Sequence, residues 1–253
     1  MEIVVLTALG VGASTVLGAI VGLLLGRAAE RIGDIILAFG AGVMLSAAML
    51  GLILPSLDHG GAFAPFITAA GVISGAGLII LSRRAMPHLE ALIGGLGESL
   101  DDTGRRRRER VFVFVMAIAI HNLPEGISAG VGFGTGNIGD AAMIAIAIAL
   151  QNIPEGMVII SPMLSVGISR TRALFFGALT GVVEVVGTLI GYFAVELSSA
   201  LLPFALSLAG GCMIEVVCDE MIPEIHSSNK GGAAVGLSLI LGFILMVALD
   251  FWI

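Results

Sequence analysis

Eight stretches of the chain are long and apolar enough to cross a membrane as helices, and this pattern limits the fold more than any other feature. They lie near residues 3–26, 33–54, 62–82, 111–134, 140–161, 172–195, 202–222 and 232–252. A spanning helix needs about 20 mostly apolar residues. Because lipid cannot bond to backbone N–H and C=O groups, such segments must satisfy them internally. We therefore predict an all-α integral membrane protein with eight transmembrane helices.

The composition excludes the soluble classes of protein. Of the 253 residues, 57% are hydrophobic and 12% are charged, whereas a soluble domain carries about a quarter of its residues as charges. A soluble enzyme, a nucleic-acid-binding protein and a disordered chain are therefore excluded. We predict a single transmembrane domain over residues 1–253, with the lipid bilayer as its outer solvent and no nucleic-acid partner.

The basic residues predict the orientation in the membrane. All twelve Lys and Arg residues fall in the gaps between spans 1 and 2, 3 and 4, 5 and 6, and 7 and 8. The positive-inside rule places these loops in the cytoplasm, so we expect a multi-pass protein of the plasma (inner) membrane with both termini outside. Residues 83–110 form the one long loop, which we expect to be cytoplasmic and partly disordered. Its run Arg105–Arg108 could bind anionic lipid or nucleic acid, but orientation is the simpler explanation.

Two internal repeats are visible. Residues 117–126 read AIAIHNLPEG and residues 147–156 read AIALQNIPEG. A fainter pair links residues 41–44, followed by Pro55, with residues 210–213, followed by Pro223. In each pair the two spans are expected to run in opposite directions. Inverted repeats with interrupted helices are typical of secondary transporters and channels rather than of enzymes.

The stronger repeat places polar side chains at membrane depth. Span 4 contains His121, Asn122 and Glu125, and span 5 contains Gln151, Asn152 and Glu155. Glu184 lies near the middle of span 6. A charge at the bilayer centre costs about 2.5–3.5 kcal/mol, so each such residue is a functional candidate.

Each copy of the repeat also contains a proline directly before its glutamate. Pro124 and Pro154 lack the N–H groups that would bond to the carbonyls of Ile120 and Leu150. Carbonyls without a helical partner are tolerated at membrane depth where they face a polar cavity. The prolines therefore predict kinked helices beside such a cavity.

Three glutamates, an imidazole and several amide oxygens at one depth indicate a divalent-cation site. Imidazole with carboxylate suits zinc, and carboxylate with amide oxygen also accommodates iron or manganese. Hydrogen bonding between helices and a proton relay are the two alternatives. Hydrogen bonding alone is disfavoured because no Lys or Arg lies at membrane depth to offset the carboxylates. We expect the metal to be a transported ion and not a catalytic cofactor.

Two further features have two interpretations each. Glu215, Asp219 and Glu220 on span 7 form either a release path toward the cytoplasm or a structural polar seam. Met44, in the middle of span 2, is either a packing residue or a soft ligand for the metal.

With these motifs the chain resembles the ZIP (Zrt-, Irt-like protein) family of divalent metal transporters, in particular its GufA-like prokaryotic branch. The resemblance covers essentially the whole chain: the spans, the long loop after span 3 and the paired Asn-x-Pro-Glu-Gly motifs. It implies a 3+2+3 inverted-repeat arrangement of the helices, a homodimer, and an elevator-like motion of one helix group against another. It also implies a binuclear metal site between spans 4 and 5.

Carried over by position, the resemblance assigns two metal sites that share Glu125 and Glu155. One would use Met44, His121, Glu125, Gln151 and Glu155, and the other would use Asn122, Glu125, Asn152, Glu155 and Glu184. Glu220, with Asp219 beside it, matches a position of an additional cytoplasm-side site. Many relatives have His where Gln151 stands and some have Asp where Asn152 stands. Fewer imidazoles leave iron, manganese and cadmium as alternatives to zinc.

The resulting expectation is uptake of zinc into the cytoplasm through the binuclear site. A passive metal-selective channel is one alternative. An intramembrane metallohydrolase is another, because His121 and Glu125 could hold zinc beside a water. The His-Glu-x-x-His motif is absent and His121 is the only histidine within a span, so we expect no enzyme.

Overall fold

The computed structural model describes residues 1–93, 102–133, 136–197, 199–227 and 232–252, and all regular secondary structure in these ranges is helical. The α-helices are α1 (Glu2–Leu25), α2 (Arg27–Ser46), α3 (Leu54–His59), α4 (Ala64–Ile93), α5 (Asp102–Gly132), α6 (Ile138–Ser165), α7 (Arg170–Leu197), α8 (Leu202–Val216), α9 (Ile222–Ser227) and α10 (Gly232–Trp252). Two π-helical segments, η1 (Ala47–Ile53) and η5 (Val217–Met221), join α2 to α3 and α8 to α9. Short 3-10 turns, η2 (Gly61–Phe63) and η4 (Ser199–Leu201), precede α4 and α8.

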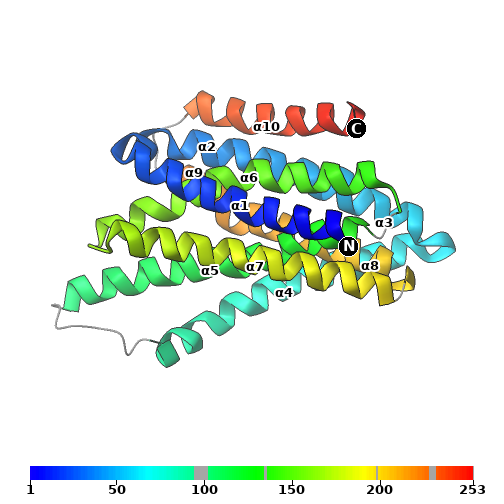
Figure 1. The fold of residues 1–253 in the computed structure, drawn as a ribbon, viewed down its shortest axis with the longest axis horizontal. Helices are drawn as coiled ribbons and strands as arrows, with labels where there is room; N and C mark the ends of the chain where they lie inside the picture. The colour runs from blue at the N-terminus through cyan, green and yellow to red at the C-terminus, as the bar shows by residue number, and fades with distance from the viewer. Residues whose placement is uncertain (94–101, 134–135, 198, 228–231, 253) are drawn as a thin grey trace.

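These helices confirm an all-α multi-pass membrane protein. Seven helical stretches of the described chain are long and apolar enough to span, at residues 2–25, 32–59, 61–82, 138–165, 170–196, 202–219 and 232–252. The remaining expected span, near 111–134, coincides with α5 up to Gly132, and residue 134 lies outside the described residues. The long helices run side by side, with both chain termini toward the same end (Figure 1).

The helices on either side of the long loop extend beyond the apolar stretches. Helix α4 continues to Ile93 and α5 begins at Asp102. These extensions contain Ala, Leu, Glu and Arg, which are strong helix formers, so the backbone stays helical where the hydropathy falls. Residues 94–101, the rest of the loop that we predicted to be partly disordered, lie outside the described residues.

The two spans of the fainter sequence repeat are both interrupted by a π-helical segment. In each span the second residue after the π segment is a proline, Pro55 after η1 and Pro223 after η5. A proline donates no backbone hydrogen bond and displaces the preceding turn, and single-turn π segments absorb such an irregularity without ending the helix. The fainter repeat therefore has a structural counterpart.

The helix pairs that pack most closely follow a simple exchange rule. Helix α1 packs on α6 and α5 packs on α7, while α2 packs on α10 and α4 packs on α8. Helix α1 also packs on α7. Exchanging α1 with α7, α2 with α8, α4 with α10 and α5 with α6 converts α1–α6 into α5–α7 and α2–α10 into α4–α8, and it leaves the pair α1–α7 unchanged.

Glycines occupy matching positions at these crossings. A Cβ atom on Gly12 of α1 would lie 2.5 Å from the carbonyl oxygen of Gly181 on α7, and a Cβ on Gly181 would collide in turn with the carbonyl oxygen of Gly12. Gly42 on α2 and Gly211 on α8 lie in the same way against the backbones of α10 and α4. Only glycine allows backbones to approach this closely, which is a common device between membrane helices.

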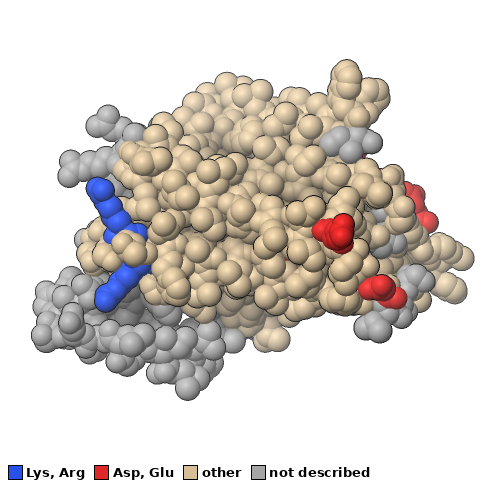
Figure 2. Space-filling view, viewed as in Figure 1, with Lys and Arg blue, Asp and Glu red and all other residues tan. Residues whose placement is uncertain are grey.

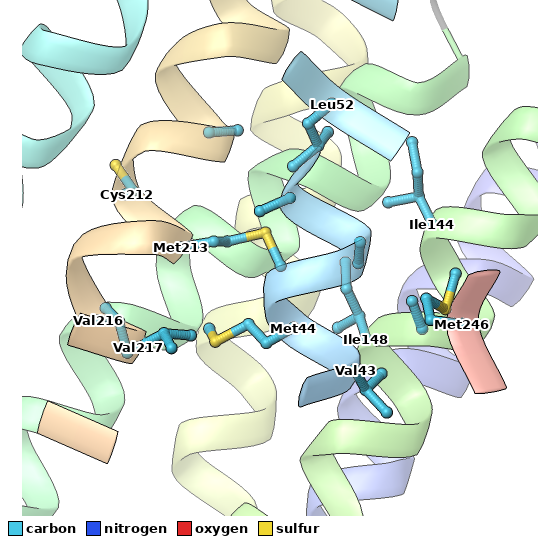
Figure 3. Close-up of a cluster of buried hydrophobic side chains, with 14 of the residues drawn as sticks. Val43, Met44, Leu52, Ile144, Ile148, Cys212, Met213, Val216, Val217 and Met246 are labelled. Carbon is cyan, nitrogen blue, oxygen red and sulfur yellow. The ribbon is translucent and has the colours of Figure 1, made fainter. Parts of the chain in front are cut away.

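A cluster of apolar side chains fills the space where α2, α6 and α8 meet. Met44, Leu52, Ile144, Ile148 and Met213 belong to it and are fully buried. Figure 3 shows Met44 on α2 and Met213 on α8 pointing across the gap between their two helices. Here α2 and α8 meet through long side chains rather than through glycines.

Charged side chains of opposite sign lie at opposite ends of one face of the molecule. On the face shown in Figure 2, the basic side chains lie at the end opposite the chain termini, and the acidic ones lie at the other end. Among the basic side chains that the structure describes, all are exposed: Arg84, Arg170 and Arg172. On this face the two signs of charge are therefore separated along the long axis of the bundle.

Candidate functional site

The predicted polar residues are buried on three adjacent helices. Asn122 and Glu125 on α5, Asn152 on α6 and Glu184 on α7 have no exposed surface, and Gln151 and Glu155 on α6 are 3% and 8% exposed. Helices α5, α6 and α7 pack on one another. His121 belongs to α5, but its side chain lies outside the described residues. The fold therefore places the described polar candidates of spans 4, 5 and 6 on helices that share an interface.

The prolines of the strong repeat lie inside α5 and α6, as predicted. Both helices continue through them, at Pro124 and Pro154. The carbonyls of Ile120 and Leu150 therefore lack their usual helical partners. Ile120 and Leu150 stand two residues before the asparagine of each motif, so each freed carbonyl adds an acceptor in the same helical turn as Asn122 or Asn152.

Glu184 is the centre of a hydrogen-bond network that joins four helices. Its Oε1 accepts from Asn122 Nδ2 at 2.6 Å and from Thr15 Oγ1 at 2.7 Å, and its Oε2 accepts from Asn152 Nδ2 at 2.7 Å. Asn152 Nδ2 also donates to the carbonyl of Val11 at 3.2 Å. A buried carboxylate needs such donors to offset its lost hydration. Hydrogen bonding between helices, one of the alternatives open from the sequence, is therefore present at Glu184.

Two amide oxygens of the repeat remain available as ligands. Asn122 Oδ1 and Gln151 Oε1 are buried and accept no hydrogen bond from the part of the chain that the structure describes. A buried acceptor without a partner costs about 1–3 kcal/mol, and amide oxygen is a ligand for divalent cations. A cation bound between α5 and α6 would interact with such oxygens in place of a hydrogen-bond donor. The set of potential ligands therefore fits a metal ion.

Carboxylates alone do not form the site. Within the described residues no three His, Cys, Asp or Glu side chains come close enough together to hold a metal. Glu125, Glu155 and Glu184 therefore do not make an all-carboxylate centre. The amide oxygens, or the imidazole of His121, would have to complete the coordination.

Met44 is packed among apolar side chains. Its side chain is 1% exposed and belongs to the apolar cluster of α2, α6 and α8, where Figure 3 shows it near Val216 and Val217. Met213, at the position of the fainter repeat that matches Met44, accepts a weak hydrogen bond from Ser128 Oγ at 3.8 Å. In this structure Met44 contributes to packing, the first of its two interpretations.

The acids of span 7 differ from the other candidates in exposure. Glu215 at the end of α8 is partly buried, and Asp219 on the π segment η5 is exposed. Glu220 belongs to η5, but its side chain lies outside the described residues. The described part of this group is therefore less buried than the polar core of α5, α6 and α7.

Thr15 is a contact of the site that the sequence prediction does not include. It is fully buried on α1, and 169 residues separate it from its partner Glu184. The same spacing relates Gly12 to Gly181 and Gly18 to Gly187. Aligning these glycines would have revealed the match, which is hidden because the residues between them differ.

Comparison with known proteins places these features in one family. The sequence profile of the ZIP zinc transporter family matches residues 97–250. The chain is 35% identical over 205 residues to the zinc transporter GufA of Myxococcus xanthus, covering 79% of this chain and 78% of that protein. It is 37% identical over 250 residues to the zinc transporter ZIPB of Bordetella bronchiseptica, covering 94% and 77%. It is 31% identical over 303 aligned positions to the human zinc transporter ZIP11, covering 87% and 88%.

Proposed function

The chain belongs to the ZIP zinc transporter family, and from this we propose that it carries zinc across the membrane into the cytoplasm. The family consists of transporters and not of enzymes. The relatives named above are zinc transporters, and the buried amide oxygens of Asn122 and Gln151 are the observation that carries the proposal. These two oxygens lie inside a membrane bundle and accept no hydrogen bond from the described residues. A bound cation would provide the interaction that they lack.

The metal would bind between α5 and α6 in a binuclear site. One ion would use Met44, His121, Glu125, Gln151 and Glu155, and the other would use Asn122, Glu125, Asn152, Glu155 and Glu184. The burial of the described members and the two helix-interior prolines support this assignment. Iron, manganese and cadmium are substrates that the same oxygen-rich ligand set would accept.

The helices would form a 3+2+3 inverted repeat. The exchange rule of the helix pairs relates the first three spans to the last three and α5 to α6. Both termini lie toward one end and the visible basic side chains lie at the other. The positive-inside rule then places the termini outside the plasma membrane and the arginines in the cytoplasm.

Transport would use an elevator-like motion of two helix groups. The first group is α1, α5, α6 and α7, and the second is α2, α3, α4, α8 and α10. Among the described glycines, every one whose Cβ would collide with another helix's carbonyl meets a helix of its own group. Gly40 on α2 and Gly51 on η1, which joins α2 to α3 of the second group, instead face side chains of α6, at Pro154 and Ile144. Backbones are locked within each group, while side chains separate the two groups.

The release path would lead past Asp219 and Glu220. The exposure of Asp219 on η5 supports a position near the end of the path rather than in the buried site. The functional protein would be a homodimer in the membrane, as the family resemblance implies.

Uptake of zinc into proteoliposomes tests the proposal. Glu125→Ala and Glu155→Ala should each abolish uptake, because each would remove a ligand shared by both ions. Glu196→Ala is the matched control, since Glu196 is an exposed acid at the far end of α7. Uptake should saturate with zinc concentration, as a carrier requires; a rate that rises linearly would favour a passive channel. Wild-type rates in both glutamate variants would refute the proposed site.

A further inference from the structure

Thr15 contacts the carboxylate of the site from a helix that carries no other polar candidate. Its hydroxyl donates to Glu184 Oε1 at 2.7 Å, and both residues are fully buried. A threonine in a helix can instead bond to a carbonyl of its own preceding turn, as Thr180 does with Gly177 at 2.8 Å. At Thr15 the hydroxyl is directed across to α7.

The inverted repeat makes Thr15 and Glu184 equivalent positions. The carbonyl of Thr15 lies against Gly156 of the motif in α6, and the carbonyl of Glu184 lies against Gly126 of the motif in α5. Gly12 and Gly181, one turn earlier on the same two helices, lie against each other. Two equivalent positions that contact each other lie beside the pseudo-two-fold axis, so one repeat places a carboxylate there and the other places a hydroxyl.

The two asparagines of the strong repeat complete the arrangement. Asn122 and Asn152 occupy equivalent positions in the motif, and they donate to Oε1 and to Oε2 of Glu184 respectively. The Glu184 carboxylate thus accepts one hydrogen bond from each motif. It accepts a third from Thr15, which occupies the position equivalent to Glu184 in the other repeat. Asn122 Oδ1 accepts no hydrogen bond from the described residues, so its amide can hold Glu184 and still offer an oxygen to a cation.

We propose that Thr15 is a positioning residue of the transport site, whose hydroxyl fixes the Glu184 carboxylate between the two asparagine amides in the orientation that receives the metal. The proposal rests on the proposed function. Hydrogen bonds to a charged group are the strong ones in proteins. Without the hydroxyl, the carboxylate keeps its two amide donors but loses the third hydrogen bond, so it is held less firmly in the metal-free protein. Zinc binding then has to order it.

The test compares Thr15→Val, which removes the hydroxyl at nearly constant volume, with Thr15→Ser, which keeps it. In zinc uptake by proteoliposomes, the valine variant should raise the half-saturating zinc concentration about ten-fold, the factor that one hydrogen bond to a charged group contributes. Its maximal rate should change little. The serine variant should stay near wild type. Thr180→Val is the matched control, because it removes a buried hydroxyl that bonds within its own helix.

The outcomes test the role of Thr15 separately from the proposed function. Equal half-saturating concentrations in the valine and serine variants would overturn the role of Thr15, whether both match wild type or both rise together. So would a valine variant that loses only maximal rate. Thr15→Ala provides the same comparison if the valine variant is not recovered in folded form. The proposed function is judged by wild type and Glu125→Ala instead, so it can stand while the Thr15 proposal falls.

Discussion

Replacing Gly12 by alanine should separate α1 from α7 at the point where the site is assembled. The new Cβ would lie 2.5 Å from the carbonyl oxygen of Gly181 and 2.9 Å from Cγ2 of Val185, where real Cβ atoms essentially never come within 3.0 Å. The two backbones must therefore move apart by about 0.5 Å or more, and an overpacked contact of this kind costs about 1–3 kcal/mol. Thr15 lies one turn away, and its 2.7 Å bond to Glu184 would lengthen with the same displacement.

Gly10→Ala is the matched control, because Gly10 lies on the same helix with no atom within 4 Å of the added Cβ. Both changes gain about 1 kcal/mol of helix propensity, so their difference isolates the crossing. We expect the melting temperature of Gly12→Ala in detergent to lie roughly 3–10 °C below that of Gly10→Ala, with a lower zinc affinity. Equal melting temperatures for the two variants would refute the close contact of α1 and α7.

Two further substitutions test the ligands themselves. His121→Ala should lower the preference for zinc over manganese at least about ten-fold in competition uptake, because imidazole favours zinc and the remaining oxygens do not; equal losses for both metals would count against His121 as the zinc-selective ligand. Asn152→Asp replaces the donor 2.7 Å from Glu184 Oε2 with a second carboxylate, so the metal-free protein should lose about 1.5–3 kcal/mol of stability. Thermal melting with and without zinc checks this, since added zinc should raise the melting temperature of the variant more than that of wild type.

The spans and the buried polar residues could be predicted because their signals are local in sequence. The length of an apolar run can be counted directly in the sequence and compared with the thickness of a bilayer. A glutamate such as Glu125 within that run is recognised as a functional candidate because a charge costs free energy in the membrane. The prolines likewise act on carbonyls four residues away, so the loss of one helical hydrogen bond at Pro124 and another at Pro154 followed from the motif alone. The extension of α4 to Ile93 could not be predicted from the hydropathy. The residues after the apolar stretch include charged side chains, but they also include strong helix formers that continue the helix.

Contacts between distant segments were the part that the sequence did not reveal. Thr15 reads as an ordinary small polar residue until the crossing of α1 and α7 places it on Glu184. Met44 has two interpretations because a thioether suits both packing and a soft metal; its neighbours in the apolar cluster show the packing, and its role as a ligand stays a prediction. The side chain of His121, to which we attribute the preference for zinc in our proposal, lies outside the described residues.

The pairing of Thr15 with Glu184 has a consequence for how such a protein can arise. Two identical half-length subunits related by a two-fold axis would place the same residue on both sides of that axis. They would bring together either two carboxylates, which repel each other in lipid, or two hydroxyls, which carry no charge for a cation. Joining the halves into one polypeptide lets the two positions mutate independently. An asymmetric polar centre inside a bundle built from two repeats can therefore arise after gene fusion. It cannot arise in a homodimer of two identical half-length subunits.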